Sequence, residues 1–142
     1  MPRTQYQAEL DLVRERQIAE RFCERFGYEM RKSVFEPRYD FGIYKEGVLA
    51  GIIEVKRRWI TLHNERFAPF VAAQKFDGCR EIAGKLSVPF ALVYGFNDVH
   101  AYYRYHPDHK LFRARGGRTS DTRDSHDVEM MVHIPQRYWK EL

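Results

Sequence analysis

Residues 49–56 read Leu-Ala-Gly-Ile-Ile-Glu-Val-Lys, and this stretch decides the fold that we expect. The first part of it, 49–53, is apolar at every position, which is typical of a central strand covered on both faces. The run then delivers Glu54 and Lys56, charged side chains of a kind rarely buried without a partner. A divalent cation is one such partner. We therefore expect a buried strand that ends in a polar site.

Asp40 lies one predicted hairpin upstream of Glu54. The segment 45–47 (Lys-Glu-Gly) predicts a chain reversal, because its glycine readily adopts a positive φ. A three-residue loop at 46–48 would set Asp40 opposite Glu54, with their Cβ atoms roughly 5 Å apart. A two-residue loop would instead place Asp40 opposite Ile53, on the wrong face unless a β-bulge corrects the register. We predict the three-residue loop.

Lys56 would share the face of Glu54, since side chains alternate along a strand. Two carboxylates and an ammonium group on one face suit metal-assisted cleavage of a phosphodiester. Asp40 and Glu54 offer hard oxygen ligands to Mg²⁺, which keeps several waters and binds substrate phosphate at the same time. Lys56 would orient or deprotonate the attacking water and stabilise the developing charge. The alternative is a surface salt bridge, the usual role of a Glu-x-Lys pair.

The composition sets the outer limits. With 142 residues, 44% of them hydrophobic, the chain is long enough for one domain, 1–142, with its own core. A net charge of +4 favours an anionic partner without identifying it. Cys23 and Cys79 have apolar neighbours in helical-looking segments, so we expect reduced thiols that pack as small hydrophobes. We find no signal peptide and no run near the ~18 apolar residues of a membrane span, and therefore expect a cytoplasmic protein.

The order of predicted elements is mixed α/β. Two helices are expected, at 7–26, ended by Gly27, and from Pro69 or Phe70 to Leu86. Between and after them we expect strands at 28–34, at the hairpin just described, at 88–96 and 99–105 across Asn97-Asp98, and at 128–134. The remaining segment, 106–127, is rich in Arg, Gly, Ser, Thr and Asp and is predicted to be a mobile basic loop.

Glu15 lies on the apolar stripe of the first predicted helix. Steps of 100° per residue place Ala19 and Phe22 within about 40° of it. A glutamate that faces the core needs an explanation. It either pairs with an arginine, such as Arg14 or Arg38, or has a functional role.

Together, these residues and the element order resemble the PD-(D/E)XK nuclease superfamily, and within it small phage-type and Holliday-junction resolvase-like nucleases. The resemblance covers about the first 105 residues. It implies a restriction-endonuclease-like fold: a single-domain αβββαβ core with a mixed central sheet flanked by helices. Asp40 matches the aspartate of the motif, Glu54 its second acid and Lys56 its lysine. Glu15 is similar to the first-helix glutamate of resolvase-like members, whereas two residues separate Pro37 from Asp40, a departure from the motif.

The resemblance implies a Mg²⁺-dependent DNA endonuclease in which Mn²⁺ can replace Mg²⁺. It also implies that junctions and branched DNA are candidate substrates. By analogy with small resolvases it also implies a homodimer. The expected metal ligands are Asp40, Glu54, Glu15 and the backbone carbonyl of Val55. The competing class is a non-catalytic DNA-binding or phage-structural protein that keeps the fold. DNA or RNA, endo- or exonuclease action, and one metal or two stay open.

Basic and polar residues near the motif are candidates for contacts with the phosphate backbone. Trp59, next to two of them, either stacks on a sugar or base or closes the core. On the second helix we favour Lys75 over Gln74 as the active-site residue. The candidates in the predicted loop either clamp a phosphate or lie on a solvated surface. The full set is Arg57, Arg58, Gln74, Lys75, Arg113, Arg115 and Arg118. We predict no zinc site from the loop histidines.

Overall fold

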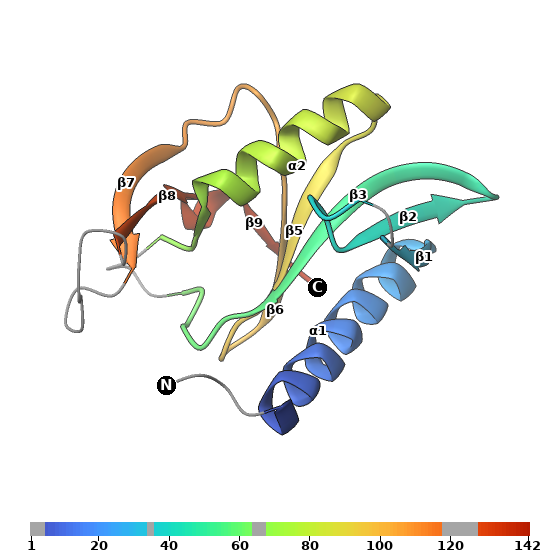
Figure 1. Cartoon of the computed structure of the whole chain (residues 1–142), viewed down its shortest axis with the longest axis horizontal. Coiled ribbons are helices and arrows are strands. Elements are labelled where there is room, and N and C mark those ends of the chain that lie inside the picture. Colours follow the sequence, from blue (N-terminus) through green and yellow to red (C-terminus); the bar gives the residue numbers. More distant parts are fainter. Residues whose placement is uncertain (1–4, 34–35, 64–67, 118–127) are drawn as a thin grey trace.

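The computed structural model describes residues 5–33, 36–63, 68–117 and 128–142 (Figure 1). Its elements, in chain order, are α1 (Gln5–Phe26), β1 (Glu29–Lys32), β2 (Phe41–Lys45), β3 (Val48–Arg57), β4 (Phe70–Ala72), α2 (Ala73–Leu86), β5 (Phe90–Gly95), β6 (His100–Arg104), β7 (Phe112–Gly117), β8 (Val128–His133), the 3₁₀ turn η2 (Gln136–Tyr138) and β9 (Trp139–Glu141). The predicted first helix is confirmed and ends where Gly27 takes a φ of +72°.

The main sheet has six strands in the order β1-β2-β3-β5-β6-β9. Strands β3 and β5 are parallel and the other neighbours are antiparallel, so the sheet is mixed. Helices α1 and α2 cover its two opposite faces (Figure 1). The predicted αβββαβ core is confirmed, with the short strand β4 inserted before α2. Neither α1 nor α2, the α-helices of the described ranges, is long and apolar enough to cross a membrane.

Strand β3 is buried on both faces because its side chains alternate between two cores. Ile53 and Val55 pack toward α1 together with Phe22 of that helix. Ile52 belongs to the core on the α2 side, and Glu54 shares that face. The predicted central strand is confirmed, and its acidic residue points into the interior.

The β2–β3 hairpin differs from the prediction in its loop. Glu46 and Gly47 alone form the turn, both with positive φ (+53° and +78°), as a two-residue type I′ connection requires. The predicted three-residue loop is therefore wrong. Ala50 is the extra residue of a β-bulge, because Tyr44 pairs with Leu49 whereas the preceding residue of β2, Ile43, pairs with Gly51. The bulge restores the register in which Asp40, if the ladder is continued, falls opposite Glu54.

The second helix begins later than predicted. Residues Phe70–Ala72 extend into β4 instead of forming its first turn, since they pair with β8. Pro69 accepts a hydrogen bond from the Ile134 amide at 2.8 Å and belongs to this sheet and not to the helix. The apolar face predicted for the helix is confirmed, with Phe76, Cys79 and Ala83 all buried.

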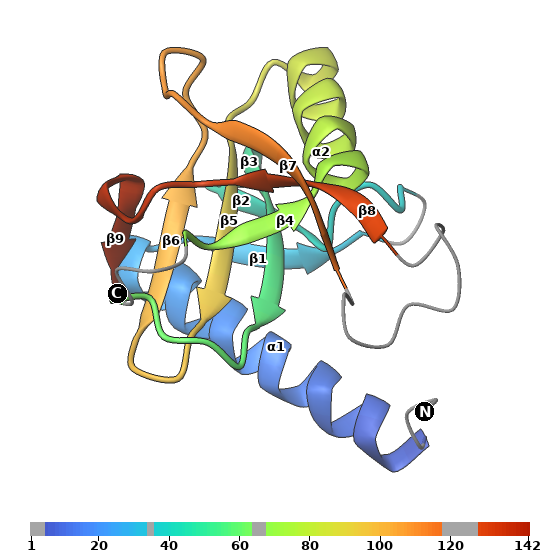
Figure 2. The same cartoon turned by 90° about the vertical axis from the view of Figure 1, so that its left-hand side faces the viewer.

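Part of the predicted loop at 106–127 is a strand. Residues Phe112–Gly117 form β7, which pairs with β8 and completes a second sheet in the order β4-β8-β7 (Figure 2). The loop prediction is wrong there, because the pairing partner lies far along the chain and leaves no local signal. Residues 118–127 lie outside the described ranges. The strands predicted around Asn97-Asp98 and at 128–134 are confirmed as β5, β6 and β8.

The two cysteines are buried in different cores. Cys23 of α1 lies on one face of the main sheet and Cys79 of α2 on the other. Burial raises the pKa of the Cys23 thiol to about 11 and that of Cys79 to about 12. Both thiols pack as small hydrophobic groups, as expected.

The contact between α1 and β5 leaves no room for a larger residue at Gly95. A Cβ atom there would lie 2.6 Å from Cδ1 and 3.1 Å from Cγ1 of Ile18, which is itself buried. We predict that Gly95→Ala destabilises the protein by about 1–3 kcal/mol. Gly84→Ala is the matched control, because a Cβ in that helical position meets nothing within 4 Å, and it should stabilise by about 0.5–1 kcal/mol. Chemical unfolding measures both, and equal effects would contradict the packing argument.

Candidate active site

Asp40 is fixed at the point where the chain enters β2. Its amide donates a hydrogen bond to the carbonyl of Ile53 at 3.1 Å. Its Oδ2 atom accepts one from the Val55 amide at 2.8 Å. The amide and the carboxylate of Asp40 thus bind β3 at Ile53 and Val55, the two residues that flank Glu54. Asp40 therefore lies opposite Glu54, as predicted.

Glu54 is the one charged side chain in the buried part of the described chain, with 2% exposure. Its Oε1 atom lies 3.3 Å from Nζ of Lys75, while Oε2 is buried and has no hydrogen-bond partner. Burial, followed by the nearby charge of Asp40, raises the pKa of Glu54 to about 8, against the opposing effect of Lys75 and Lys56. The carboxyl group therefore keeps its proton to a higher pH than an ordinary glutamate does.

Lys56 follows on the same face of β3, two residues beyond Glu54. It is half-buried, and within the described ranges it forms no hydrogen bond or ion pair. Its charge nevertheless acts on the Glu54 carboxyl group. An ammonium group in this state is available to a ligand.

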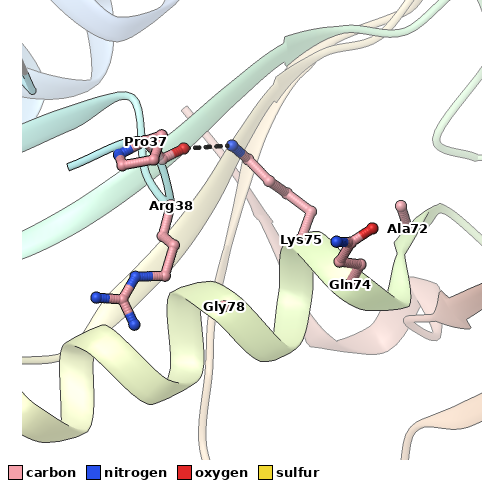
Figure 3. A pocket seen from close by; sticks show the side chains of 6 residues that line it. All are labelled: Pro37, Arg38, Ala72, Gln74, Lys75 and Gly78. Atoms are coloured by element: carbon pink, nitrogen blue, oxygen red, sulfur yellow. Dashed lines mark hydrogen bonds between the residues drawn. The ribbon is translucent and has the colours of Figure 1, made fainter.

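Lys75 reaches the site from the first turn of α2. Its ammonium group bridges Glu54 and the carbonyl of Pro37, to which it donates a hydrogen bond at 3.2 Å (Figure 3). Gln74, the alternative on this helix, is exposed. Both residues line a cavity of about 260 Å³ together with Pro37, Arg38, Ala72 and Gly78. The helix therefore aims Lys75 at Glu54, and the role of Lys75 as an active-site residue stays a prediction.

Glu15 approaches from the α1 side. It is half-buried and lines a cavity of about 220 Å³ that Asp40 also lines. The other lining residues are Leu12, Val13, Arg16, Lys32 and Phe41. Asp40 thus lies between Glu54, across the hairpin, and Glu15, across this cavity.

The three acids do not form a closed cage. Among the residues that the structure describes, no group of three His, Cys, Asp or Glu side chains is close enough to hold an ion by itself. The Val55 carbonyl is a further oxygen at this edge. In an extended strand the N–H and C=O of one residue point to the same side, and the Val55 N–H points to Asp40.

Most of the predicted phosphate contacts already have protein partners. Arg57 donates to Gly95 O at 2.7 Å, and Arg58 donates to Phe70 O at 3.3 Å. Arg113 belongs to β7 and forms a bidentate ion pair with Asp77 of α2, at 2.6 and 3.0 Å. Its predicted contact with a phosphate stays a prediction. Arg115 is exposed on β7, and Arg118 lies outside the described ranges.

One residue of this region was missed by the sequence analysis. Tyr94 of β5 is fully buried on the Glu54 side, beneath the guanidinium group of Arg58, which lies 5.3 Å from the ring centroid. Burial raises its pKa to about 12. Its alternation with Leu92 along β5 was the available signal.

Comparison with known protein families gives a match over the whole chain. A model for the family described as "Phage putative PDDEXK endonuclease" matches residues 1–142. The chain belongs to this family. The resemblance predicted from Asp40, Glu54 and Lys56 is thereby confirmed at the level of the PD-(D/E)XK nucleases. A search of curated proteins found no match.

The raised pKa of Glu54 predicts a specific pH dependence of stability without metal. Between pH 4.5 and about 8 the folded state keeps a proton that the unfolded state releases, so the wild type loses stability as pH rises. Glu54→Gln has no such proton. We predict that the unfolding free energy of Glu54→Gln, relative to that of the wild type, rises by more than about 1 kcal/mol from pH 5 to pH 8. Urea unfolding in EDTA measures this difference.

The exposed Glu46→Gln, in the hairpin turn, is the control for loss of one charge and should track the wild type at both pH values. A constant difference between Glu54→Gln and the wild type would show that burial does not perturb this carboxyl group.

Proposed function

We propose that this member of the family is a Mg²⁺-dependent endonuclease that cleaves DNA, with Mn²⁺ able to replace Mg²⁺. One observation carries the proposal. Asp40 lies opposite Glu54 across the β2–β3 hairpin, with its carboxylate fixed by the Val55 amide. Lys56, without a hydrogen bond or ion pair among the described residues, stands on the same strand face. Two hard anionic ligands beside a free ammonium group suit metal-assisted phosphodiester cleavage.

The donor set fits Mg²⁺ even though it is not a closed cage. This ion is usually bound through one or two carboxylates, and it fills its remaining positions with waters and substrate phosphate. The buried Oε2 atom of Glu54, which has no hydrogen-bond partner, is the kind of orphaned oxygen that a cation would satisfy. Asp40 would supply the second carboxylate, with the Val55 carbonyl and Glu15 at the margin of the site.

Once bound, the metal ion would polarise the scissile phosphate and a coordinated water. Asp40 is oriented for its part by the hydrogen bond from Val55, which fixes the carboxylate before any ligand arrives. Lys56 would place positive charge next to the phosphate as negative charge develops, and it would orient the attacking water. Lys75, which lies 3.3 Å from Glu54 without a cation, would move away from it when the cation binds.

The wider surroundings support an anionic polymer as the substrate. The chain carries a net charge of +4, and exposed or half-buried basic groups lie around the site at Arg57, Arg58 and Lys75. Contacts of this kind bind the phosphate backbone without reading sequence. Selectivity would then come from DNA shape, as for junctions or branches, and the protein would act in the host cytoplasm as a homodimer.

The second candidate is a DNA-binding protein that has kept the fold without turnover. The contact between Lys75 and Glu54 favours it, since an acidic side chain that already has a cationic neighbour has less need of a metal ion. Both candidates bind DNA. Only the nuclease loses a measurable reaction when Lys56 is removed.

We predict that the wild type nicks supercoiled plasmid or cleaves branched DNA in Mg²⁺ or Mn²⁺ and is inactive in EDTA. Asp40→Asn, Glu54→Gln and Lys56→Ala should each lower the rate by about 100-fold or more, because each removes a metal ligand or the charge that stabilises the transition state. Gel assays with plasmid, linear duplex and four-way junctions measure the rate and the shape preference together.

Lys45→Ala is the matched control, because this exposed lysine stands at the opposite end of the same hairpin. It should cleave like the wild type. Nicking by Lys56→Ala at the wild-type rate, or no nicking by the wild type on any of the substrates, would favour binding alone.

A further inference from the structure

Trp59 is a large aromatic side chain left open to solvent. It is 62% exposed, whereas Trp139, the second tryptophan of the chain, is 7% exposed and donates its indole N–H to the carbonyl of Ile134. Trp59 makes no hydrogen bond to any described residue. The sequence left open whether it closes the core or contacts a ligand, and its exposure excludes the first role.

Two arginines hold the indole in place. The guanidinium group of Arg57 lies 4.1 Å from the Trp59 ring centroid, and that of Arg14, from α1, lies 5.4 Å from it. Arg57 cannot easily move, since it donates to Gly95 O at 2.7 Å and to Asn97 Oδ1 at 3.0 Å. The indole therefore rests on a fixed cation and still exposes most of its surface, which is the arrangement of a rigid stacking platform.

The platform adjoins the candidate active site. Trp59 is three residues beyond Lys56, a distance of at most about 11 Å along an extended chain. Arg14 directly precedes Glu15, which lines the cavity shared with Asp40. Helix α1 passes the C-terminal end of β3 (Figure 2). One strand of nucleic acid is long enough to contact the platform and the acids together.

We propose that Trp59, flanked by Arg14 and Arg57, stacks on an unpaired base of the DNA strand. The positive charges match the phosphates on both sides of such a base, and the indole matches its face. A paired base within a duplex is covered on both faces by its neighbours, so only single-stranded, flipped or branched DNA offers this contact. The inference rests on the proposed function, because it names the substrate class of the same site.

Binding of short oligonucleotides in EDTA tests the platform apart from cleavage. The probes are an oligothymidylate of about 12 nucleotides, an oligouridylate and a blunt duplex of the same length, a size within the range of known single-strand sites. The wild type should bind the single strands with quenching of tryptophan emission. Trp59→Ala should weaken single-strand binding by about 10- to 100-fold and duplex binding by less than about threefold.

Phe112→Ala, which removes an aromatic side chain that is also exposed but lies on β7, is the control and should bind like the wild type. Trp59→Phe leaves Trp139 as the reporter and should lose the quenching. Thermal unfolding checks that each variant is folded. A loss with the oligothymidylate supports the proposal, whereas a loss confined to the oligouridylate would overturn DNA as the ligand and favour RNA.

Equal affinity of Trp59→Ala and the wild type for both single strands would overturn the proposal, as would quenching that persists in Trp59→Phe. The outcome is separate from the nuclease assignment. If the wild type binds through Trp59 but never nicks DNA, the nuclease assignment fails and the stacking proposal stands. If the wild type nicks DNA but Trp59 has no role in binding, the stacking proposal fails and the nuclease assignment stands.

Discussion

Strand β3 carries Glu54 into the interior of the sheet, and the cost of holding a carboxyl group there constrains its neighbours. A buried carboxylate without a partner would be strongly destabilising. Opposing charges come from two elements, since β3 itself supplies Lys56 and α2 supplies Lys75. Asp40, at the lead-in to β2, instead adds a like charge that raises the pKa of Glu54 further. Because each group comes from a different part of the fold, the arrangement exists only when the hairpin, the sheet and α2 are assembled.

The basic residues around this centre fall into two groups. Arg57, Arg58 and Arg113 are held by carbonyl oxygens or by a carboxylate, so the fold fixes the position of their guanidinium groups. Lys56 has no such partner in the described ranges. This difference singles out Lys56 as the basic side chain that a ligand could contact without displacing a protein partner. The even spread of positive charge along the sequence does not single out any residue.

The sequence was sufficient for the elements whose signals are local. The apolar run of β3, the helical stripe of α1 and the turn at Asn97-Asp98 all lie within short windows. Strands β4 and β7 were missed because they depend on pairing with β8, and three residues such as Phe70–Ala72 carry no pattern of their own. The hairpin shows a finer limit: spacing placed Asp40 opposite Glu54, but a bulge at Ala50, not a longer loop, produces that register.

In the candidate site, too, the groupings with a local signal could be predicted from the sequence, whereas contacts between distant segments could not. Asp40, Glu54 and Lys56 could be grouped from strand alternation, and Glu15 from helix phase. The contact of Lys75 with Glu54 needed the relative placement of α2 and β3, which no local pattern supplies. The partners of Arg57 and Arg113 likewise belong to distant segments, so their availability to DNA could not be judged beforehand.

The burial of Cys23 and Cys79 has a practical consequence. Their thiols are enclosed in separate cores and carry raised pKa values, so very little thiolate is present at neutral pH. Maleimide dyes and spin labels react with thiolates at the surface. A single cysteine introduced on an exposed position would therefore be labelled selectively in the otherwise native chain, without first replacing the two natural thiols.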